Sequence, residues 1–179
     1  MKKGYFVTGT DTDVGKTWAT VALMRFFKAH GLSVLGMKPV AAGCEWRDGQ
    51  LKNEDALLIQ ENSSISIDYQ QVNPYAFEAA VSPHLSAKNE VVELEVILRV
   101  FECIKQMADV ILVEGAGGWL VPVNHKFDIA DLASEMKLPV ILVVAIRLGC
   151  INHARLTYKA IIDSGCNCVG WLAVCVDSE

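Results

Sequence analysis

The stretch GTDTDVGKT, residues 9–17, decides the fold because it joins an apolar run to a long helical pattern. Residues 5–7 precede it and predict a strand, and residues 15–30 predict a helix that stops at Gly31. A loop that wraps phosphates needs unhindered backbone N–H groups and a helix N-terminus aimed at the anion. Lys16 supplies a cation for the phosphates, and the Thr17 hydroxyl suits Mg²⁺. This combination predicts a nucleoside-triphosphate site.

The spacing of this loop differs by one residue from the usual phosphate-binding motif. That motif would place a glycine at position 10, where the chain has Thr10, and the glycine stands at Gly9 instead. The alternative interpretation is a glycine-rich turn with a solvated lysine.

The rest of the chain alternates short apolar runs with helical patterns, which is typical of a parallel sheet covered on both faces. We therefore predict one α/β domain over residues 1–179, with three layers and a mostly parallel sheet. The further strands are expected at 33–37, 110–113, 140–145 and 169–176, and the further helices at 54–61 (capped by Asn53), 91–107, 128–136 (capped by Asp128) and 151–164. Residues 62–90 are expected to be loop, with a short extended piece at 69–72.

Composition excludes several classes of protein. The 179 residues are 52% hydrophobic and carry a net charge of −5, so whole-chain disorder is excluded and nucleic acid is a poor partner. No uncharged apolar run reaches the ~18 residues of a membrane helix, and no secretory signal is visible, so we expect a cytoplasmic protein without membrane contact. The six cysteines are interpreted as reduced, buried or half-buried residues, because they lack paired metal-ligand spacing.

Two acidic residues are candidates for holding a magnesium ion. Glu114 ends a buried apolar run directly before GAGG, and ligands bind at the carboxyl ends of parallel strands. Its alternative role is a strand terminus that reaches solvent. Asp55 lies in the first turn of a helix, where an acid that complements the helix dipole is an adequate explanation on spacing alone.

Lys38 directly follows the second predicted strand and would join Lys16 at the same edge of the sheet. A protein that only hydrolyses nucleotide needs one such lysine. The second indicates an anionic co-substrate or a transferred group whose charge must be neutralised. The alternative is a surface lysine.

Taken together, GTDTDVGKT, KPVAAG, NEDALLIQ, VNPY, SPH, VEGAGGW, LPVILV and LGCINH resemble the dethiobiotin synthetase family. The resemblance runs in order from about residue 4 to 177. It implies a homodimer of P-loop NTPase-like α/β domains that joins 7,8-diaminopelargonate, CO2 and ATP to give dethiobiotin, ADP and phosphate. A substrate carbamate would take the γ-phosphoryl group, and the second amine would then close the ureido ring.

The resemblance also implies roles for individual residues. Lys38 and Lys16 would be catalytic, and Thr17, Asp55 and Glu114 would hold Mg²⁺. The nucleotide would meet Asp13, Val14, Gly15, Lys16, Thr17, Trp18, Asp55, Glu114, Gly115, Ala116, Gly117, Val174 and Cys175. The substrate would meet Thr12, Lys38 and Ala42, together with Cys150, Ile151 and Asn152 from the partner subunit, so the site would span the dimer interface.

The sequence departs from the family pattern at three places. Ala42 stands where the family usually has a serine, and Val174 stands where an asparagine amide pairs with the adenine edge. Family members also continue for some tens of residues beyond Glu179, so the C-terminal end is expected to be truncated. These departures leave two alternatives open: a switch-type ATPase of the same fold, or an inactive truncated member. Asp11 and Asp13 argue against the switch, which typically carries a second lysine in this loop.

Overall fold

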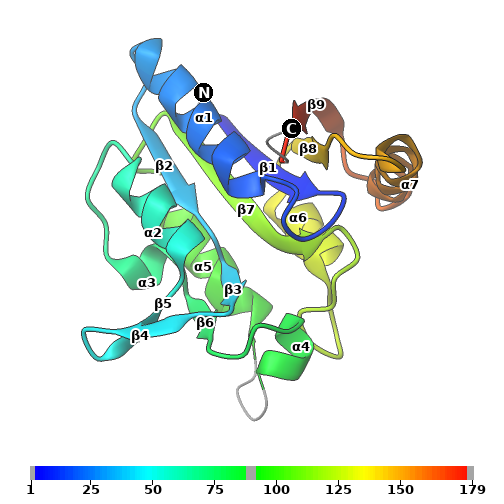
Figure 1. Cartoon of the computed structure of the whole chain (residues 1–179). Coiled ribbons are helices and arrows are strands. Elements are labelled where there is room, and N and C mark those ends of the chain that lie inside the picture. The colour runs from blue at the N-terminus through cyan, green and yellow to red at the C-terminus, as the bar shows by residue number, and fades with distance from the viewer. Residues whose placement is uncertain (1–2, 88–91, 177–179) are drawn as a thin grey trace.

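The core of the structure is a five-stranded parallel sheet in the order β2-β7-β1-β8-β9. The computed structural model describes residues 3–87 and 92–176 (Figure 1). The strands are β1 (Lys3–Gly9), β2 (Val34–Met37), β7 (Val110–Gly118), β8 (Val140–Ala145) and β9 (Cys168–Val174). Those of the centre are buried on both faces, as their continuous apolar runs predict.

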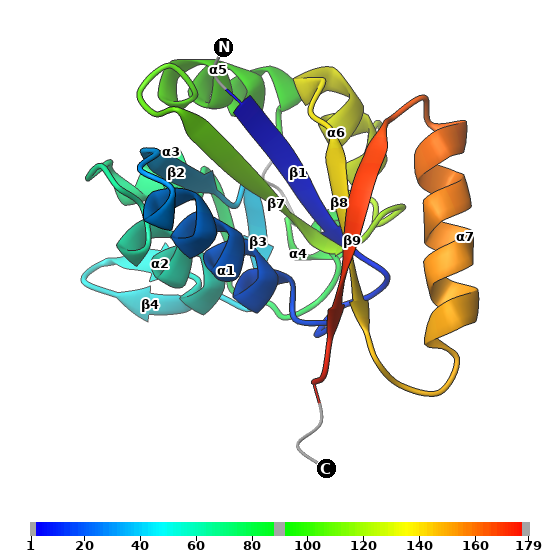
Figure 2. The ribbon, with the colours of Figure 1, turned by 90° about the horizontal axis from the view of Figure 1, so that it is seen from above.

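Helices cover both faces of this sheet. Figures 1 and 2 show α1 (Lys16–Ala29) on one face and α5 (Leu94–Ile104) with α6 (Ile129–Met136) on the other. The helix α2 (Glu54–Glu61) packs beside α1 and β2, and α7 (Cys150–Asp163) lies beside β8 and β9. The predicted fold class, an α/β protein with a mostly parallel sheet between helical layers, is confirmed.

Helix caps explain where two of the predicted helices begin. Asn53 Oδ1 accepts a hydrogen bond from Ala56 N at 3.2 Å, and Asp128 Oδ1 accepts one from Asp131 N at 3.0 Å. Both caps were predicted. Apart from β7, the other predicted helices and strands match their predicted ranges within a few residues. Val91, where one helix was expected to begin, lies outside the described residues.

The region expected to be loop contains more structure than predicted. Residues 69–72 form a helical turn, α3 (Tyr69–Val72), rather than an extended piece. Gln71 Oε1 accepts a hydrogen bond from Asp68 N, and the turn buries Tyr69 and Val72. The same region holds β6 (Tyr75–Phe77), which pairs with β3 (Val40–Ala42), and the short helix α4 (Pro83–Ser86). Such three- and four-residue elements are too short for a periodic signal.

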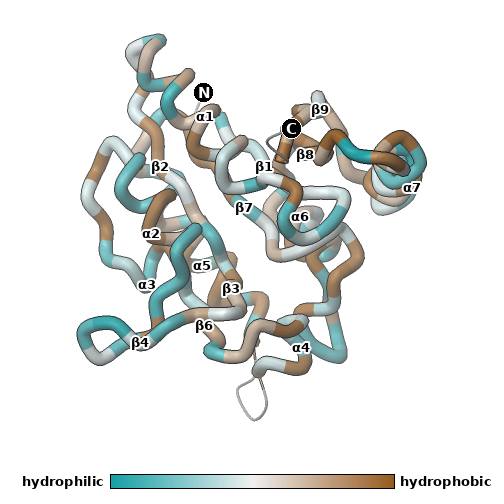
Figure 3. Tube along the Cα trace, viewed as in Figure 1, coloured by the Kyte–Doolittle hydropathy of each residue, from teal (hydrophilic) through white to brown (hydrophobic). Residues whose placement is uncertain are grey.

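Two further elements, a hairpin and a longer strand, differ from the prediction. The antiparallel pair β4 (Glu45–Arg47) and β5 (Gln50–Lys52) replaces an expected loop, and its turn is hydrophilic in Figure 3. Strand β7 does not end at Glu114 but runs to Gly118, which pairs with Gly9 after a register shift between Val7 and Gly9 in which β7 carries the extra residues. Glu114 therefore lies inside the sheet rather than at a strand terminus.

The described residues include all six cysteines, and all are free thiols. Cys44 is buried and three others are half-buried, as expected, but Cys103 and Cys175 are exposed, so the expectation of burial was wrong for these two. In residues 3–87 and 92–176, no helix is long and apolar enough to cross a bilayer.

Candidate functional site

The phosphate loop connects β1 to α1 at the carboxyl edge of the sheet. Gly15 caps the helix with φ 85°, a left-handed conformation that favours glycine. A Cβ at this position would also lie 2.7 Å from Val174 Cγ1, which is too close for any side chain. The loop therefore needs glycine at position 15 for two reasons, and the last residue of β9 packs directly against it.

Lys16 and Lys38 are both nearly buried, but they make different contacts. Lys16 Nζ donates to the backbone oxygen of Asp11 at 2.7 Å. Burial lowers the pKa of Lys16 to about 8, although the charge of Glu114 opposes this shift. Lys16 is therefore the cation of the site that titrates closest to neutral pH.

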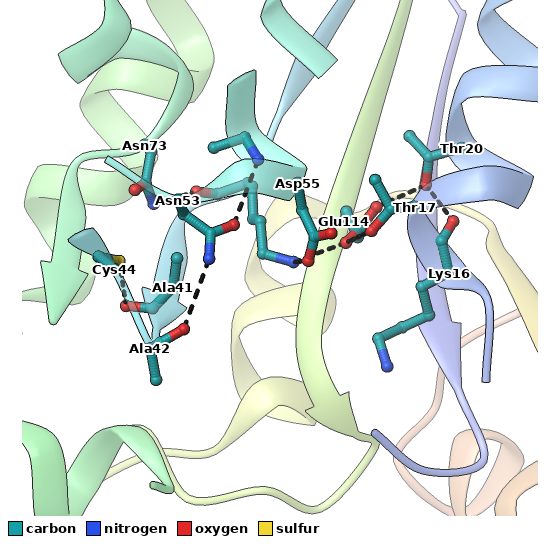
Figure 4. A network of polar contacts seen from close by, with 12 residues as sticks. Lys16, Thr17, Thr20, Ala41, Ala42, Cys44, Asn53, Asp55, Asn73 and Glu114 are labelled. Atoms are coloured by element: carbon teal, nitrogen blue, oxygen red, sulfur yellow. Dashed lines mark hydrogen bonds and ion pairs between the residues drawn. The ribbon is translucent and has the colours of Figure 1, made fainter. Parts of the chain in front are cut away.

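Lys38 forms two ion pairs, both at 2.7 Å: one to Asp55 Oδ2 and one to Glu114 Oε1. Figure 4 shows the side chains of Asp55 and Glu114 pointing toward the same place beside Thr17. Burial favours the neutral form of this lysine, but the carboxylates of Glu114 and Asp55 outweigh burial and raise the pKa of Lys38. The group stays charged throughout the physiological range. The alternative of a solvated surface lysine is wrong, since the side chain is only 7% exposed.

Glu114 is the most enclosed charge of the site, with a fully buried side chain. Besides the ion pair to Lys38, Oε1 accepts a hydrogen bond from Thr17 Oγ1 at 3.0 Å and Oε2 accepts one from Thr20 Oγ1 at 2.9 Å. Thr20 was not predicted as a site residue. The signal was its position four residues after Lys16, on the same face of α1.

Asp55 enters the site from the first turn of α2, and its side chain is 42% exposed. Burial opposes ionisation of this carboxyl, but the charge and hydrogen bond of Lys38 lower its pKa below the ordinary value. Its contact with Lys38 is a specific one, beyond what the helix-dipole interpretation requires.

These side chains face a cavity of about 910 Å³. Its lining contains most of the predicted site residues: Thr12, Asp13, Gly15, Lys16, Thr17, Trp18, Lys38, Ala42, Asp55, Glu114, Ala116, Gly117, Val174 and Cys175. It also contains residues that sequence reasoning missed, namely Ala41, Asn53, Ala80, Val81, Val121 and Val176. Ala41 and Asn53 belong to the KPVAAG and NEDALLIQ motifs, whereas Ala80, Val81, Val121 and Val176 lie outside the motifs quoted above. Ser82 and Pro83 also line it and belong to the SPH motif.

Two predicted nucleotide contacts do not line this cavity. Val14 is completely buried beneath the loop. Gly115 lies against the core, where an added Cβ would come within 3.1 Å of Ile129 and Phe6.

The predicted partner-subunit residues lie apart from this cavity as well. Cys150 and Ile151 line a second cavity of about 530 Å³ between α7 and β9, and Asn152 is exposed beside them. Within one chain, the structure does not bring these three residues to the phosphate loop.

The donor set fits a magnesium ion. Mg²⁺ is usually held by one or two carboxylates with waters and substrate phosphates completing its shell. Asp55, Glu114 and the Thr17 hydroxyl meet at the cavity wall and are linked by the hydrogen bonds above. In the described residues, no group of three or more His, Cys, Asp and Glu side chains lies in a position to hold a metal ion.

The sheet order, the loop and the paired cations define an α/β protein of the P-loop type. In agreement, the profile of the AAA domain family matches residues 3–179. The chain resembles a solved BceF tyrosine kinase domain (TM-score 0.57, 16% identity, 98% of this chain and 69% of that one) and a ParA family ATPase from Chlorobium tepidum TLS (TM-score 0.54, 12% identity, 98% and 74%). At these identities the likeness shows the fold alone.

Proteins with similar sequences identify the family more narrowly than the solved structures do. The chain is 48% identical over 180 residues to the ATP-dependent dethiobiotin synthetase of Cellvibrio japonicus (strain Ueda107). The aligned region covers 99% of this chain and 79% of that protein. It is 49% identical over 175 residues to one of Escherichia coli (strain K12), covering 97% and 78%. The chain belongs to the ATP-dependent dethiobiotin synthetase family.

Proposed function

We propose that the chain catalyses the ATP-dependent closure of the ureido ring of dethiobiotin from 7,8-diaminopelargonate and CO2, the penultimate step of biotin biosynthesis. The observation that carries this proposal is the pair of buried lysines at one cavity, Lys16 on the phosphate loop and Lys38 opposite it. Two anionic reactants, a carbamate and a γ-phosphate, need cations that hold them together.

The reaction divides into three steps. One substrate amine adds to CO2 and loses a proton, which gives a carbamate. A carbamate oxygen then attacks the γ-phosphorus, the bond to the bridging oxygen breaks, and ADP leaves. The second amine attacks the carbon of the resulting carbamic–phosphoric anhydride and expels phosphate as the ring closes.

The residues of the chain position and neutralise these groups. The backbone N–H groups of the loop and the Lys16 ammonium hold the phosphates, and Lys38 holds the carbamate. A Mg²⁺ ion held by Thr17, Asp55 and Glu114 would neutralise charge on the phosphate oxygens. Thr12 and Ala42, both on the cavity wall, would meet the substrate.

Two departures change affinity rather than chemistry. Ala42 has no hydroxyl, and one lost hydrogen bond is worth about 0.5–1.5 kcal/mol of binding energy. Val174 carries no amide for the adenine edge, and its side chain packs on Gly15 instead. The adenine would then be recognised by shape and backbone groups near Cys175.

A second copy of the chain would complete the site. Ile151 is 75% exposed and follows Gly149, the N-cap of α7, so the segment 150–152 is available to a partner. We propose a homodimer in which this segment reaches the far end of the partner's substrate. Location in the cytoplasm stays a prediction from the sequence.

The test is phosphate release from Mg-ATP, with and without diaminopelargonate and bicarbonate together. Release that requires both supports the synthetase. Release that ignores them would point to a switch-type ATPase, and no release in any condition would point to an inactive member of the family.

A further inference from the structure

The Lys38 ammonium lies between the two carboxylates that are expected to bind metal. Its Nζ is 2.7 Å from Asp55 Oδ2 and 2.7 Å from Glu114 Oε1, so both contacts converge on one atom. A cation therefore already occupies the position between these oxygens.

The hydrogen bonds around Glu114 hold this arrangement in place. Glu114 accepts hydrogen bonds from Thr17 and Thr20 in addition to Lys38, and its side chain is fully buried. Lys16 donates elsewhere, to the backbone of Asp11. Lys38 alone of the two lysines neutralises the carboxylate pair by direct contact.

A metal ion at this position would repel the Lys38 ammonium. Mg²⁺ binds oxygen at about 2.0–2.1 Å, so an ion bonded to either carboxylate oxygen would lie within about 5 Å of Nζ. Like charges at that separation repel strongly in a buried, low-dielectric site.

We propose that Lys38 is an internal counter-cation, which holds the metal position between Asp55 and Glu114 and leaves it when Mg²⁺ arrives with the nucleotide. This inference rests on the proposed function, which supplies the metal and the nucleotide. Without nucleotide, the two ammonium groups and the two carboxylates balance in charge. Entry of the metal releases Lys38 into the cavity that it lines with Ala41 and Ala42, where its charge is free for the anionic substrate.

The test measures metal binding in the absence of ATP and substrate, so it does not depend on turnover. Mn²⁺, a spectroscopic substitute for Mg²⁺, is titrated into wild type and Lys38→Met and followed by electron paramagnetic resonance. We expect Lys38→Met to bind Mn²⁺ at least about tenfold more tightly, because the competing cation is gone. Its midpoint of thermal unfolding should fall in EDTA and recover in Mg²⁺, whereas that of wild type should barely change.

Lys16→Met is the matched control, since it also removes one buried ammonium but not one that contacts the carboxylates. It should tighten Mn²⁺ binding by no more than about threefold. Equal tightening in the two variants, or none in Lys38→Met, would overturn the proposal.

If Lys38→Met does not fold, the comparison moves to a background with one carboxylate fewer. Lys38→Met/Asp55→Asn should then bind Mn²⁺ more tightly than Asp55→Asn alone, and equal affinities would refute the inference. A wild-type enzyme that fails to make dethiobiotin, yet shows these metal-binding differences, would contradict the proposed function and not the counter-cation role of Lys38.

Discussion

Two regions of the sheet differ in the contacts that their side chains make. One is the carboxyl end of the strands around Lys38, Asp55 and Glu114, here called the polar edge, and the other is the α7–β9 side of the sheet, here called the apolar edge. At the first, the charged groups of Lys38, Asp55 and Glu114 find partners within the chain. At the second, large apolar side chains are exposed, with Trp171 at 66% and Ile151 at 75%.

The helices next to these edges show the same contrast. Five residues of α1 are buried, whereas Ile161 alone is buried among the fourteen residues of α7, all of which lie in the described part of the chain. Figure 2 shows α7 at the outer side of the molecule, beside β9, and the second cavity between them has a mostly apolar lining. The difference fits the proposed homodimer, in which one chain supplies the lysines and carboxylates and the exposed apolar residues of α7 contact the partner chain.

The substitution with the largest expected effect at the polar edge is Lys38→Ala. Turnover of the three substrates should fall by about 10²-fold or more, because the variant removes a cation that stabilises transition-state charge. Lys3→Ala, which removes an exposed lysine at the start of β1, away from the phosphate loop, is the control and should leave turnover unchanged. Near wild-type turnover in Lys38→Ala would contradict its catalytic role.

At the apolar edge, Ile151→Glu should abolish the dimer and lower turnover roughly tenfold or more, because a charge replaces an anchor at the proposed interface. The free energy of unfolding of the isolated chain should stay within about 0.5 kcal/mol of wild type, since the side chain is exposed. Light scattering and phosphate release test both parts. A variant that remains dimeric and active would remove α7 from the interface.

A subtler change at the polar edge is Thr20→Val. The variant leaves a buried oxygen of Glu114 without its hydroxyl donor, so the free energy of unfolding should drop by about 1–3 kcal/mol. Urea denaturation measures this loss, and Thr20→Ser should recover most of it. Equal stability of the valine and serine variants would show that the hydrogen bond contributes little.

The smallest effect is one of pH. With its pKa near 8, Lys16 loses its positive charge as the pH rises through 8, whereas Lys38 keeps its charge. Affinity for a non-hydrolysable ATP analogue should be constant below this pH and fall above it, by less than about tenfold between pH 8 and 9. The same titration with Lys16→Arg should be flat. A flat profile in wild type would mean that Lys16 is not the titrating cation.

The two edges also differ in how well the sequence predicted them. The phosphate loop, the helix caps and the central strands have local signals, namely glycine, capping residues and continuous β-branched runs, so their elements were predicted closely. Asn53, for example, identifies the start of α2 without any tertiary information.

Contacts across the fold were harder to predict. The bond of Thr20 to Glu114 spans 94 residues, and the pairing of β3 with β6 depends on three residues in each strand. The helical turn of α3 was missed because a single turn carries no periodicity. The sequence predicted that Lys38 and Glu114 lie at the carboxyl ends of the strands, but it did not predict that Lys38 bridges Glu114 and Asp55.

The central place of β1 also constrains the order in which the chain can fold. Residues 3–9 pair with β7 and with β8, whose last residue is Ala145. During synthesis at about 5–20 residues per second, the first strand therefore waits on the order of ten seconds for its second neighbour. Until then, the backbone groups of β1 that pair with β8 have no strand partner, so the nascent chain is most prone to aggregation during this interval. The phosphate loop, encoded near the beginning of the chain, is among the last parts to be held in place.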